Sequence, residues 1–295
     1  MDLNLYLKRK RKAIDRFLKA YLALKKKGNS CPEQLYKSMG YSLMAGGKRL
    51  RPILAIASYE VAGGRSKDIL PVAASLELIH TYSLIHDDLP AIDNDDMRRN
   101  KQTNHKVFGE ATAILAGDAL LTDAFDMISR TKAKADVLLS IIREITHACG
   151  PQGMIGGQML DILLEGKKAK REELLYIHTH KTGALIRASV RVGTIMAGAS
   201  QDKLNALTRY GENVGLAYQI VDDILNITGK EKEIGKSVGS DIVRGKNTYP
   251  SLFGIEKSRE MAECLIEKSL MAIRDFDDKA EPLREIAKYI LRRRN

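Results

Sequence analysis

Apolar residues recur every three to four positions along most of this chain, which is the periodicity of a helix with one buried face. The stretch "AASLELIHTYSLIH" is a clear example. No run alternates apolar and polar residues with β-branched enrichment, so strands are not expected. No Pro/Ser-rich linker divides the chain, and we predict one all-α domain over residues 1–295. The predicted helices cover about residues 30–45, 48–62, 68–89, 110–130, 133–149, 153–165, 171–198, 201–227, 250–274 and 280–293.

One long stretch, residues 229–250, breaks the helical pattern. It contains four glycines and five basic residues. Irregular segments of this length within a compact domain are often functional, so we expect this loop to serve a site.

The charge balance suggests an anionic partner. The 48 Lys and Arg residues exceed the 37 Asp and Glu residues, which gives a formal charge of +11. Nucleic acid, an anionic membrane surface and phosphorylated small molecules would all fit this charge. No apolar run approaches the length of a membrane span, and no signal peptide is apparent. Cys31, Cys149 and Cys264 form no CxxC pair, so we expect a reduced, cytoplasmic protein.

Acidic residues cluster in "SLIHDDLPAIDNDDMRRN". Pro90 cannot continue the incoming helix, so Asp87 and Asp88 should lie at its C-terminus, with Asp93 on the following turn. The C-terminus of a helix carries partial negative charge, which disfavours bare carboxylates and favours a bound cation. This cluster therefore predicts a metal site.

A second acidic group lies in "GLAYQIVDDILN". At 100° per residue, Gln219, Asp222, Asp223 and Asn226 fall on one stripe of an otherwise apolar helix. Buried carboxylates are costly unless a cation or a basic group compensates them. Oxygen ligands without His or Cys favour Mg²⁺, which binds few carboxylates and bridges to substrate phosphates.

Basic residues supply the complementary charge. "AGGKRLRP" places Lys48, Arg49 and Arg51 where a Gly-Gly turn meets a new helix, which suits an anion. Further basic candidates are Arg98, Arg99, Lys181, Lys236 and Lys246. Carboxylates for Mg²⁺ beside cations for phosphate oxygens predict a diphosphate site.

These motifs resemble those of the trans-prenyl diphosphate synthases, in particular the short-chain bacterial farnesyl diphosphate synthase type. The resemblance runs in order through "GGKRLRP", "ELIHTYSLIHDDLPAIDNDDMRRN", "NHKVFGEATAILAGDALL", "GGQMLD", "HTHKTG", "GLAYQIVDDIL" and "GSDIVRGKNTYP", roughly residues 40–255. It implies an all-helical bundle around a deep central cavity, assembled as a homodimer. It also implies a Mg²⁺-dependent condensation of isopentenyl diphosphate with dimethylallyl or geranyl diphosphate to give farnesyl diphosphate.

The resemblance assigns roles residue by residue. About three Mg²⁺ ions, with Mn²⁺ as the alternative, would grip the allylic diphosphate. Their ligands would be Asp87, Asp88, Asp93 and Asp222, with Asp223 in support. The leaving diphosphate would contact Arg98, Lys181 and Lys236, and Lys246 is a further substrate-binding candidate. Isopentenyl diphosphate would be held by Lys48, Arg51, His80 and Arg99, and the path of the cation would be lined by Thr182 and Gln219. Tyr82 and Ser83 match the positions that limit product length.

Other readings remain open. The product could be geranylgeranyl diphosphate, or the chain could be a catalytically weak subunit of another synthase, although the first aspartate motif is intact. The pair His86-Asp87 also occurs in helical phosphohydrolases, but the other histidines show no supporting pattern. Nucleic acid is disfavoured because the clustered aspartates would repel its backbone. The basic N-terminal helix could lie on an anionic membrane or be simply solvated.

Two departures and two weaker signals accompany the resemblance. Asn226 stands where relatives usually have a third aspartate, which predicts weaker metal binding by that helix. Asn100 stands where relatives often have glycine after the two arginines. The terminal "RRRN" could help close the isopentenyl site. His178 and His180 are two residues apart on a predicted helix, so a shared zinc ion is not expected.

Overall fold

Helices make up most of the computed structural model, which describes residues 1–27, 32–228 and 245–293. The expected all-α fold class is confirmed. The longer helices are α1 (Leu3–Lys27), α2 (Glu33–Leu43), α3 (Leu50–Val61), α4 (Ile69–Asp87), α6 (Glu110–Ser129), α7 (Ala135–Cys149), α8 (Met154–Leu163), α10 (Ala184–Met196), α11 (Gln201–Thr228), α15 (Ile255–Ala272) and α16 (Glu281–Arg292). The short elements are α5 (Asn104–Phe108), α9 (Arg171–Ile177), the π-helical turn η1 (His178–Gly183), α14 (Tyr249–Phe253), the 3-10 turn η2 (Asp278–Ala280) and the strands β1 (Met97–Arg98) and β2 (Lys101–Gln102).

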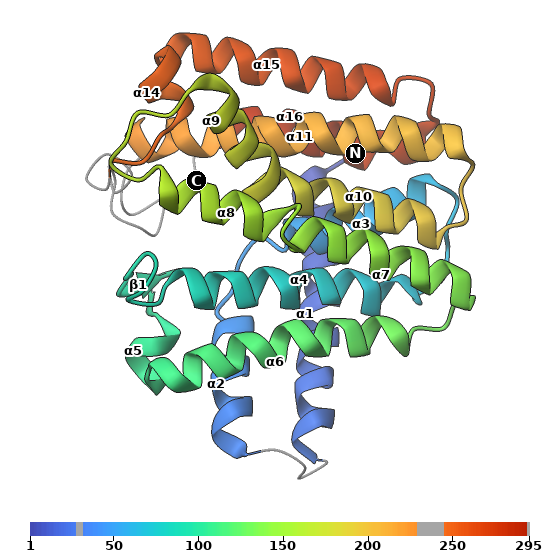
Figure 1. The fold of residues 1–295 in the computed structure, drawn as a ribbon. Coiled ribbons are helices and arrows are strands. Elements are labelled where there is room, and N and C mark those ends of the chain that lie inside the picture. The colour runs from blue at the N-terminus through green and yellow to red at the C-terminus, as the bar shows by residue number, and fades with distance from the viewer. Residues whose placement is uncertain (28–31, 229–244, 294–295) are drawn as a thin grey trace.

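The helices stack in layers (Figure 1). The helix α15 lies along α11, α11 along α10, and α10 packs on α3 and α7. On the other side of α3 come α4 and then α6. The central helices are therefore covered on both sides, which explains why α3 and α4 are apolar over most of their surface.

The N-terminal helix α1 runs across this stack (Figure 1) and contributes Tyr6, Ile14 and Leu18 to the core. The part of α1 that carries these three side chains is covered by protein, whereas Leu5 and Leu24 of the same helix are exposed. Among the described residues, no helix is long and apolar enough to span a membrane.

A buried ion cluster joins three helices at the start of α3. The Arg49 guanidinium donates to Glu77 of α4 (2.7 Å), to Asp15 of α1 (2.9 Å) and to the Leu43 carbonyl (2.7 Å). Arg49 is only 2% exposed. The sequence grouped Arg49 with anion-binding residues, but its side chain faces inward and holds the helices together.

Local structure differs from the helical prediction in several places. The predicted helix 171–198 contains the π-helical turn, and the predicted helix 250–274 is divided at Gly254, whose φ is 82°. The antiparallel ribbon β1–β2 and the helix α5 were not predicted. Such short elements depend on tertiary contacts, because their few residues carry too little periodic pattern to be recognised.

The C-terminal ends of α4 and α11 lie at the same end of the bundle, on the left of Figure 1. The ribbon and α14 lie at this end too. These segments carry the two acidic motifs and Arg98 and Arg99, whereas Lys48 and Arg51 lie at the start of α3 and Lys181 and Thr182 lie on η1. Most of the predicted loop 229–250 lies outside the described residues.

Candidate active site

The first acidic motif forms where α4 ends. The chain turns back after Asp87, and the backbone N–H of Asp93 donates to the Asp87 carbonyl at 2.8 Å. Burial raises the pKa of Asp87, and the negative charges of Asp93 and Asp88 raise it further, against the opposing charges of Lys181 and Arg98. A cation bound here would therefore be stabilised by concentrated negative charge.

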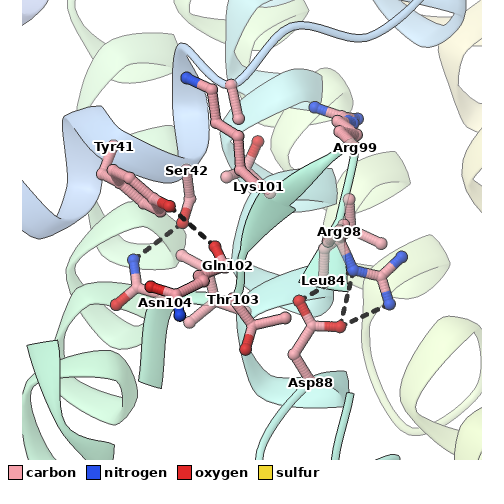
Figure 2. A pocket seen from close by; sticks show the side chains of 13 residues that line it. Tyr41, Ser42, Leu84, Asp88, Arg98, Arg99, Lys101, Gln102, Thr103 and Asn104 are labelled. Atoms are coloured by element: carbon pink, nitrogen blue, oxygen red, sulfur yellow. Dashed lines mark hydrogen bonds and ion pairs between the residues drawn. The ribbon is translucent and has the colours of Figure 1, made fainter. Parts of the chain in front are cut away.

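Asp88 lies differently from its neighbour. Its carboxylate is 3% exposed and accepts two bonds from Arg98 Nε, at 2.6 and 2.8 Å, beside Arg98 Nη2 at 2.5 Å. Figure 2 shows Arg98 reaching from the ribbon to this carboxylate. Although burial lowers the pKa of Arg98, the contacts with Asp88 raise it above its ordinary value. Asp88 thus anchors Arg98 beside the first motif.

The ribbon turn points Arg99 the other way (Figure 2). Arg99 and Asn100 have φ values of 53° and 60°, so both turn residues occupy the left-handed region that a tight hairpin requires. Asparagine tolerates this region better than most residues, which explains how Asn100 replaces glycine. The Arg99 guanidinium donates to the Gly46 carbonyl (2.5 Å). A Cβ on residue 47 would lie 2.7 Å from the central carbon of that guanidinium. Because Gly47 has no side chain, Arg99 can lie against the backbone there.

A small pocket of about 30 Å³ lies beside the ribbon, and Figure 2 shows the side chains that line it. Its walls include Tyr41, Thr81, Asp88, Arg99 and Asn104. It adjoins the first motif through Asp88.

Four arginines surround His80. Burial lowers the pKa of His80 well below its ordinary value, and the charges of Arg51, Arg99, Arg98 and Arg49 lower it further. His80 is therefore a neutral hydrogen-bonding group in a strongly cationic region. The Nε of Arg51 is buried with no hydrogen-bond partner among the described residues. A guanidinium group with an unpartnered Nε, in a cationic region that also holds a neutral histidine, suits an incoming anion.

Asp222 of the second acidic motif contacts Arg293, which lies near the C-terminus. Arg293 Nη2 forms an ion pair with Asp222, and its guanidinium stacks 4.1 Å from the centre of the Tyr218 ring. Arg293 is 6% exposed, yet its Nε and Nη1 have no partner in the described part of the chain. Burial and the positive charge of Arg293 lower the pKa of Lys48 to about 8. Lys48, Arg293 and Asp222 therefore belong to one electrostatic cluster.

Lys181 lies between two acidic groups. Its ammonium donates to Asp161 of α8 at 2.6 Å and also feels the charges of Asp87 and Asp93. The π-helical turn that carries Lys181 packs so closely on α8 that a Cβ on Gly157 would lie 2.2 Å from the Lys181 backbone nitrogen. Lys246 contacts Asp93 at 3.0 Å, which joins residues 153 positions apart. Lys236 lies outside the described residues.

Asp223, the other aspartate of the second motif, is buried. One carboxylate oxygen accepts from the Gln219 amide at 2.9 Å, and the other accepts from the Tyr249 backbone N–H at 3.0 Å. His178 Nε2 lies 3.5 Å from the latter oxygen, and burial lowers the pKa of His178 to about 3, so this ring is neutral. The Thr182 hydroxyl donates to the Gln219 amide oxygen at 2.7 Å.

The two chain-length candidates lie one to two turns before Asp87. Tyr82 is 5% exposed, and its buried hydroxyl has no hydrogen-bond partner among the described residues. Ser83 donates to the His80 carbonyl within the helix. His86 contacts the Ile114 carbonyl of α6 at 3.0 Å. It therefore packs against α6, which does not support a phosphohydrolase His-Asp metal pair.

Comparison with known proteins gives the family. A sequence profile described as polyprenyl synthetase matches residues 32–289. The chain belongs to the polyprenyl synthetase family. It is 50% identical to a geranylgeranyl diphosphate synthase from Cyanophora paradoxa over 267 residues, which cover 90% of this chain and 89% of that relative. It is 46% identical to a farnesyl diphosphate synthase from Micrococcus luteus over 271 residues, or 92% and 93% of the two chains.

The fold agrees with solved structures of the family. The structure of an FPP/GFPP synthase from Zymomonas mobilis aligns with a TM-score of 0.85 at 35% identity, covering 98% of this chain and 99% of that one. The expectation of a prenyltransferase acting on prenyl diphosphates is thus confirmed at family level. Relatives named for different product lengths leave the product to be argued separately.

The polyprenyl synthetase site fits a divalent metal held jointly with substrate. Within the described residues, no three His, Cys, Asp or Glu side chains form a ready-made metal cluster. Asp93 and Asp222 instead contact Lys246 and Arg293. Mg²⁺ typically takes one or two carboxylates and completes its shell with water and phosphate oxygens, so a full protein cage is not needed.

Sequence reasoning missed several residues of this site. Asp161 and Tyr249 were not selected, although they hold Lys181 and Asp223. Asp161 ends the motif "GGQMLD", whose acidic residue in an apolar helix was the available signal. For Tyr249 the contact comes from its backbone, which no side-chain pattern reveals. His178 and His180 point to different partners, Asp223 and the ring of Tyr176.

Proposed function

We propose that this protein is a Mg²⁺-dependent prenyltransferase that condenses isopentenyl diphosphate with dimethylallyl or geranyl diphosphate to give farnesyl diphosphate. The observation that carries the proposal is the pairing of two sites with opposite charge. Carboxylates of α4 and α11 border a region where Arg51 and Arg293 keep buried guanidinium nitrogens without partners among the described residues. Such nitrogens lack hydrogen-bond acceptors that the oxygens of an anionic ligand would supply, and the clustered carboxylates favour a bound cation.

The allylic diphosphate would bind between the first motif and Lys181. Asp87, Asp93 and Asp222 are the proposed metal ligands; Mg²⁺, when bound, neutralises negative charge on the diphosphate as it leaves. Arg98 and Lys181 would bind the diphosphate oxygens directly, from positions already fixed by Asp88 and Asp161. Lys246, Lys236 and the remaining motif carboxylates Asp88 and Asp223 complete the proposed set.

Isopentenyl diphosphate would bind in the cationic region of Lys48, Arg51, His80 and Arg99. We add Arg293, because its buried guanidinium lies beside Lys48. Neutral His80 can donate one ring N–H to a phosphate oxygen without adding charge.

The reaction then balances without a protein nucleophile. The allylic carbon–oxygen bond breaks, and its electron pair leaves with the diphosphate. The double bond of isopentenyl diphosphate supplies the electrons of the new carbon–carbon bond. The resulting cation loses a proton to the released diphosphate, which restores a double bond.

Two product lengths are supported by specific observations. Tyr82 is a large, buried side chain five residues before Asp87, a distance of roughly 7.5 Å along α4. It favours a short cavity and hence farnesyl diphosphate, as in the Micrococcus luteus relative. Geranylgeranyl diphosphate is the second candidate, because the Cyanophora paradoxa relative carries that name at 50% identity. We further propose a homodimer of single-domain subunits in the cytoplasm.

The test is incubation with isopentenyl diphosphate, each allylic diphosphate and Mg²⁺, followed by chromatographic sizing of the products. Farnesyl diphosphate should accumulate and should not be extended when supplied as the starter. Asp87→Asn should lower kcat by roughly 100-fold or more. Asp96→Asn is the matched control, because Asp96 is exposed and contacts Lys106 instead. No prenyl product under any combination would overturn the proposal.

A further inference from the structure

A chain of hydrogen bonds connects Asp223 to Thr182 through Gln219. The Gln219 amide nitrogen donates to Asp223 at 2.9 Å, and the Thr182 hydroxyl donates to the Gln219 amide oxygen at 2.7 Å. The second carboxylate oxygen of Asp223 accepts from the backbone N–H of Tyr249 at 3.0 Å. Asp223 is 3% exposed, so this chain begins at a buried group with fixed partners.

The chemistry of these groups fixes the direction of every bond. A carboxylate only accepts hydrogen bonds, so Asp223 must receive the nitrogen end of the Gln219 amide. The oxygen end of that amide then faces Thr182 and can only accept. Thr182 must therefore give its single hydroxyl hydrogen to Gln219. Neither lone pair of the Thr182 oxygen is used in this bond, and no donor to that oxygen is found in the described part of the chain.

The position of Thr182 relates this direction to the reaction. Thr182 directly follows Lys181, whose ammonium feels the charges of Asp87 and Asp93. Gln219 lies one helical turn before Asp222. Thr182 therefore adjoins Lys181 in the chain, and its hydrogen-bond acceptor Gln219 stands one turn from Asp222. A carbon that loses this diphosphate would develop its positive charge in the same region.

We propose that Asp223 is a positioning residue that acts through Gln219 to aim the lone pairs of Thr182, and not its hydrogen, at the allylic cation. The inference rests on the proposed function and gives Asp223 a role other than metal support. Dipoles held in place before charge develops stabilise a transition state without reorganisation. A hydroxyl free to rotate would lose part of this effect.

Asp223→Asn tests the direction while keeping the number of bonds. The Tyr249 N–H can only donate, so the new amide must turn its oxygen toward Tyr249 and its nitrogen toward Gln219. Gln219 must then reverse and donate to Thr182, which consumes a lone pair and releases the hydroxyl hydrogen. We expect kcat to fall roughly 10- to 100-fold, while the KM values of both diphosphates change less than about twofold.

Moving the carboxylate from residue 223 to residue 219 should restore the direction of the Thr182 hydrogen bond. In the double variant Asp223→Asn/Gln219→Glu, the new glutamate accepts from both the asparagine and Thr182. We expect kcat to recover at least roughly fivefold over Asp223→Asn alone. A structural loss at position 223 would not be repaired by a second substitution that changes charge.

A binding measurement provides a second readout. The probe is an amine analogue of the allylic diphosphate, in which a protonated nitrogen replaces the charged carbon. It is compared with a thio analogue that keeps the diphosphate but carries no positive charge at that centre. Wild type should prefer the amine analogue. In Asp223→Asn the ratio of the two affinities, amine over thio, should fall roughly tenfold, and the double variant should restore it.

Controls separate this inference from the proposed function and from misfolding. Asp123→Asn removes a half-buried carboxylate that binds Tyr21 and Lys25 far from the site, and it should leave kcat unchanged. If Asp223→Asn does not fold, Gln219→Leu breaks the relay while Asp223 keeps Tyr249, and the same losses are expected. With an active wild type, the inference would be overturned if these substitutions left kcat and the preference for the amine analogue unchanged. It would also be overturned if the double variant did not restore them. An inactive wild type would instead overturn the proposed function.

Discussion

Lys48 should produce a pH signature on the isopentenyl side of the site. Burial and the neighbouring charge of Arg293 lower the pKa of Lys48 to about 8, while Asp222 opposes the shift. The ammonium is then roughly nine-tenths charged at pH 7 and one-tenth charged at pH 9. Since the neutral amine cannot attract a diphosphate, kcat/KM for isopentenyl diphosphate should fall about tenfold between these pH values.

Two variants isolate the cause. Lys48→Arg should abolish the fall, because arginine stays charged throughout this range. Arg293→Met removes the positive neighbour and should move the midpoint to higher pH. The assay measures initial rates from pH 6.5 to 9.5 at saturating geranyl diphosphate and fixed free Mg²⁺. A fall that persists unchanged in Lys48→Arg would refute the assignment to Lys48.

Three further substitutions test other features. Tyr82→Ala should give prenyl products longer than those of wild type, measured by chromatography; an unchanged product would place the cavity floor elsewhere. Asn226→Asp should lower the Mg²⁺ concentration for half-maximal rate, since it adds a carboxylate to the stripe of Asp222; an unchanged Mg²⁺ requirement would mean that a third carboxylate is dispensable. Arg49→Met should cost about 3–5 kcal/mol in denaturant unfolding, because it leaves Glu77 buried without its cation, and adding Glu77→Gln should recover much of this loss. Equal stability of Arg49→Met and wild type would contradict the structural role of Arg49.

The sequence located both acidic motifs but could not assign the two members of each pair. Residues adjacent on a helix point about 100° apart, so Asp222 and Asp223 lie at opposite edges of the stripe that carries Gln219 and Asn226. The Asp222 side chain keeps 52% of its surface exposed, whereas Asp223 is buried against α14. Which member turns inward depends on the helix that packs there, and periodicity carries no information about that neighbour. The same holds for Asp87 and Asp88.

Helix positions were predictable because the apolar pattern is long and regular. The π-helical turn was not predictable, because the local pattern does not show its close packing against α8 at Gly157. The inward turn of Arg49 also escaped prediction. Its acidic partners, Asp15 and Glu77, are 34 and 28 residues away, and nothing near Arg49 in the chain distinguishes it from Lys48 or Arg51.

The contact between Arg99 and Gly47 affects how these two positions can be varied in a mutant library. Positions 47 and 99 share one volume, since even a methyl group at 47 would overlap the guanidinium. A library that samples the two sites independently would mostly contain chains in which one choice defeats the other. Gly47 also has a φ of 115°, which disfavours any side chain, so residues other than glycine at 47 should be rare and should occur only beside short side chains at 99.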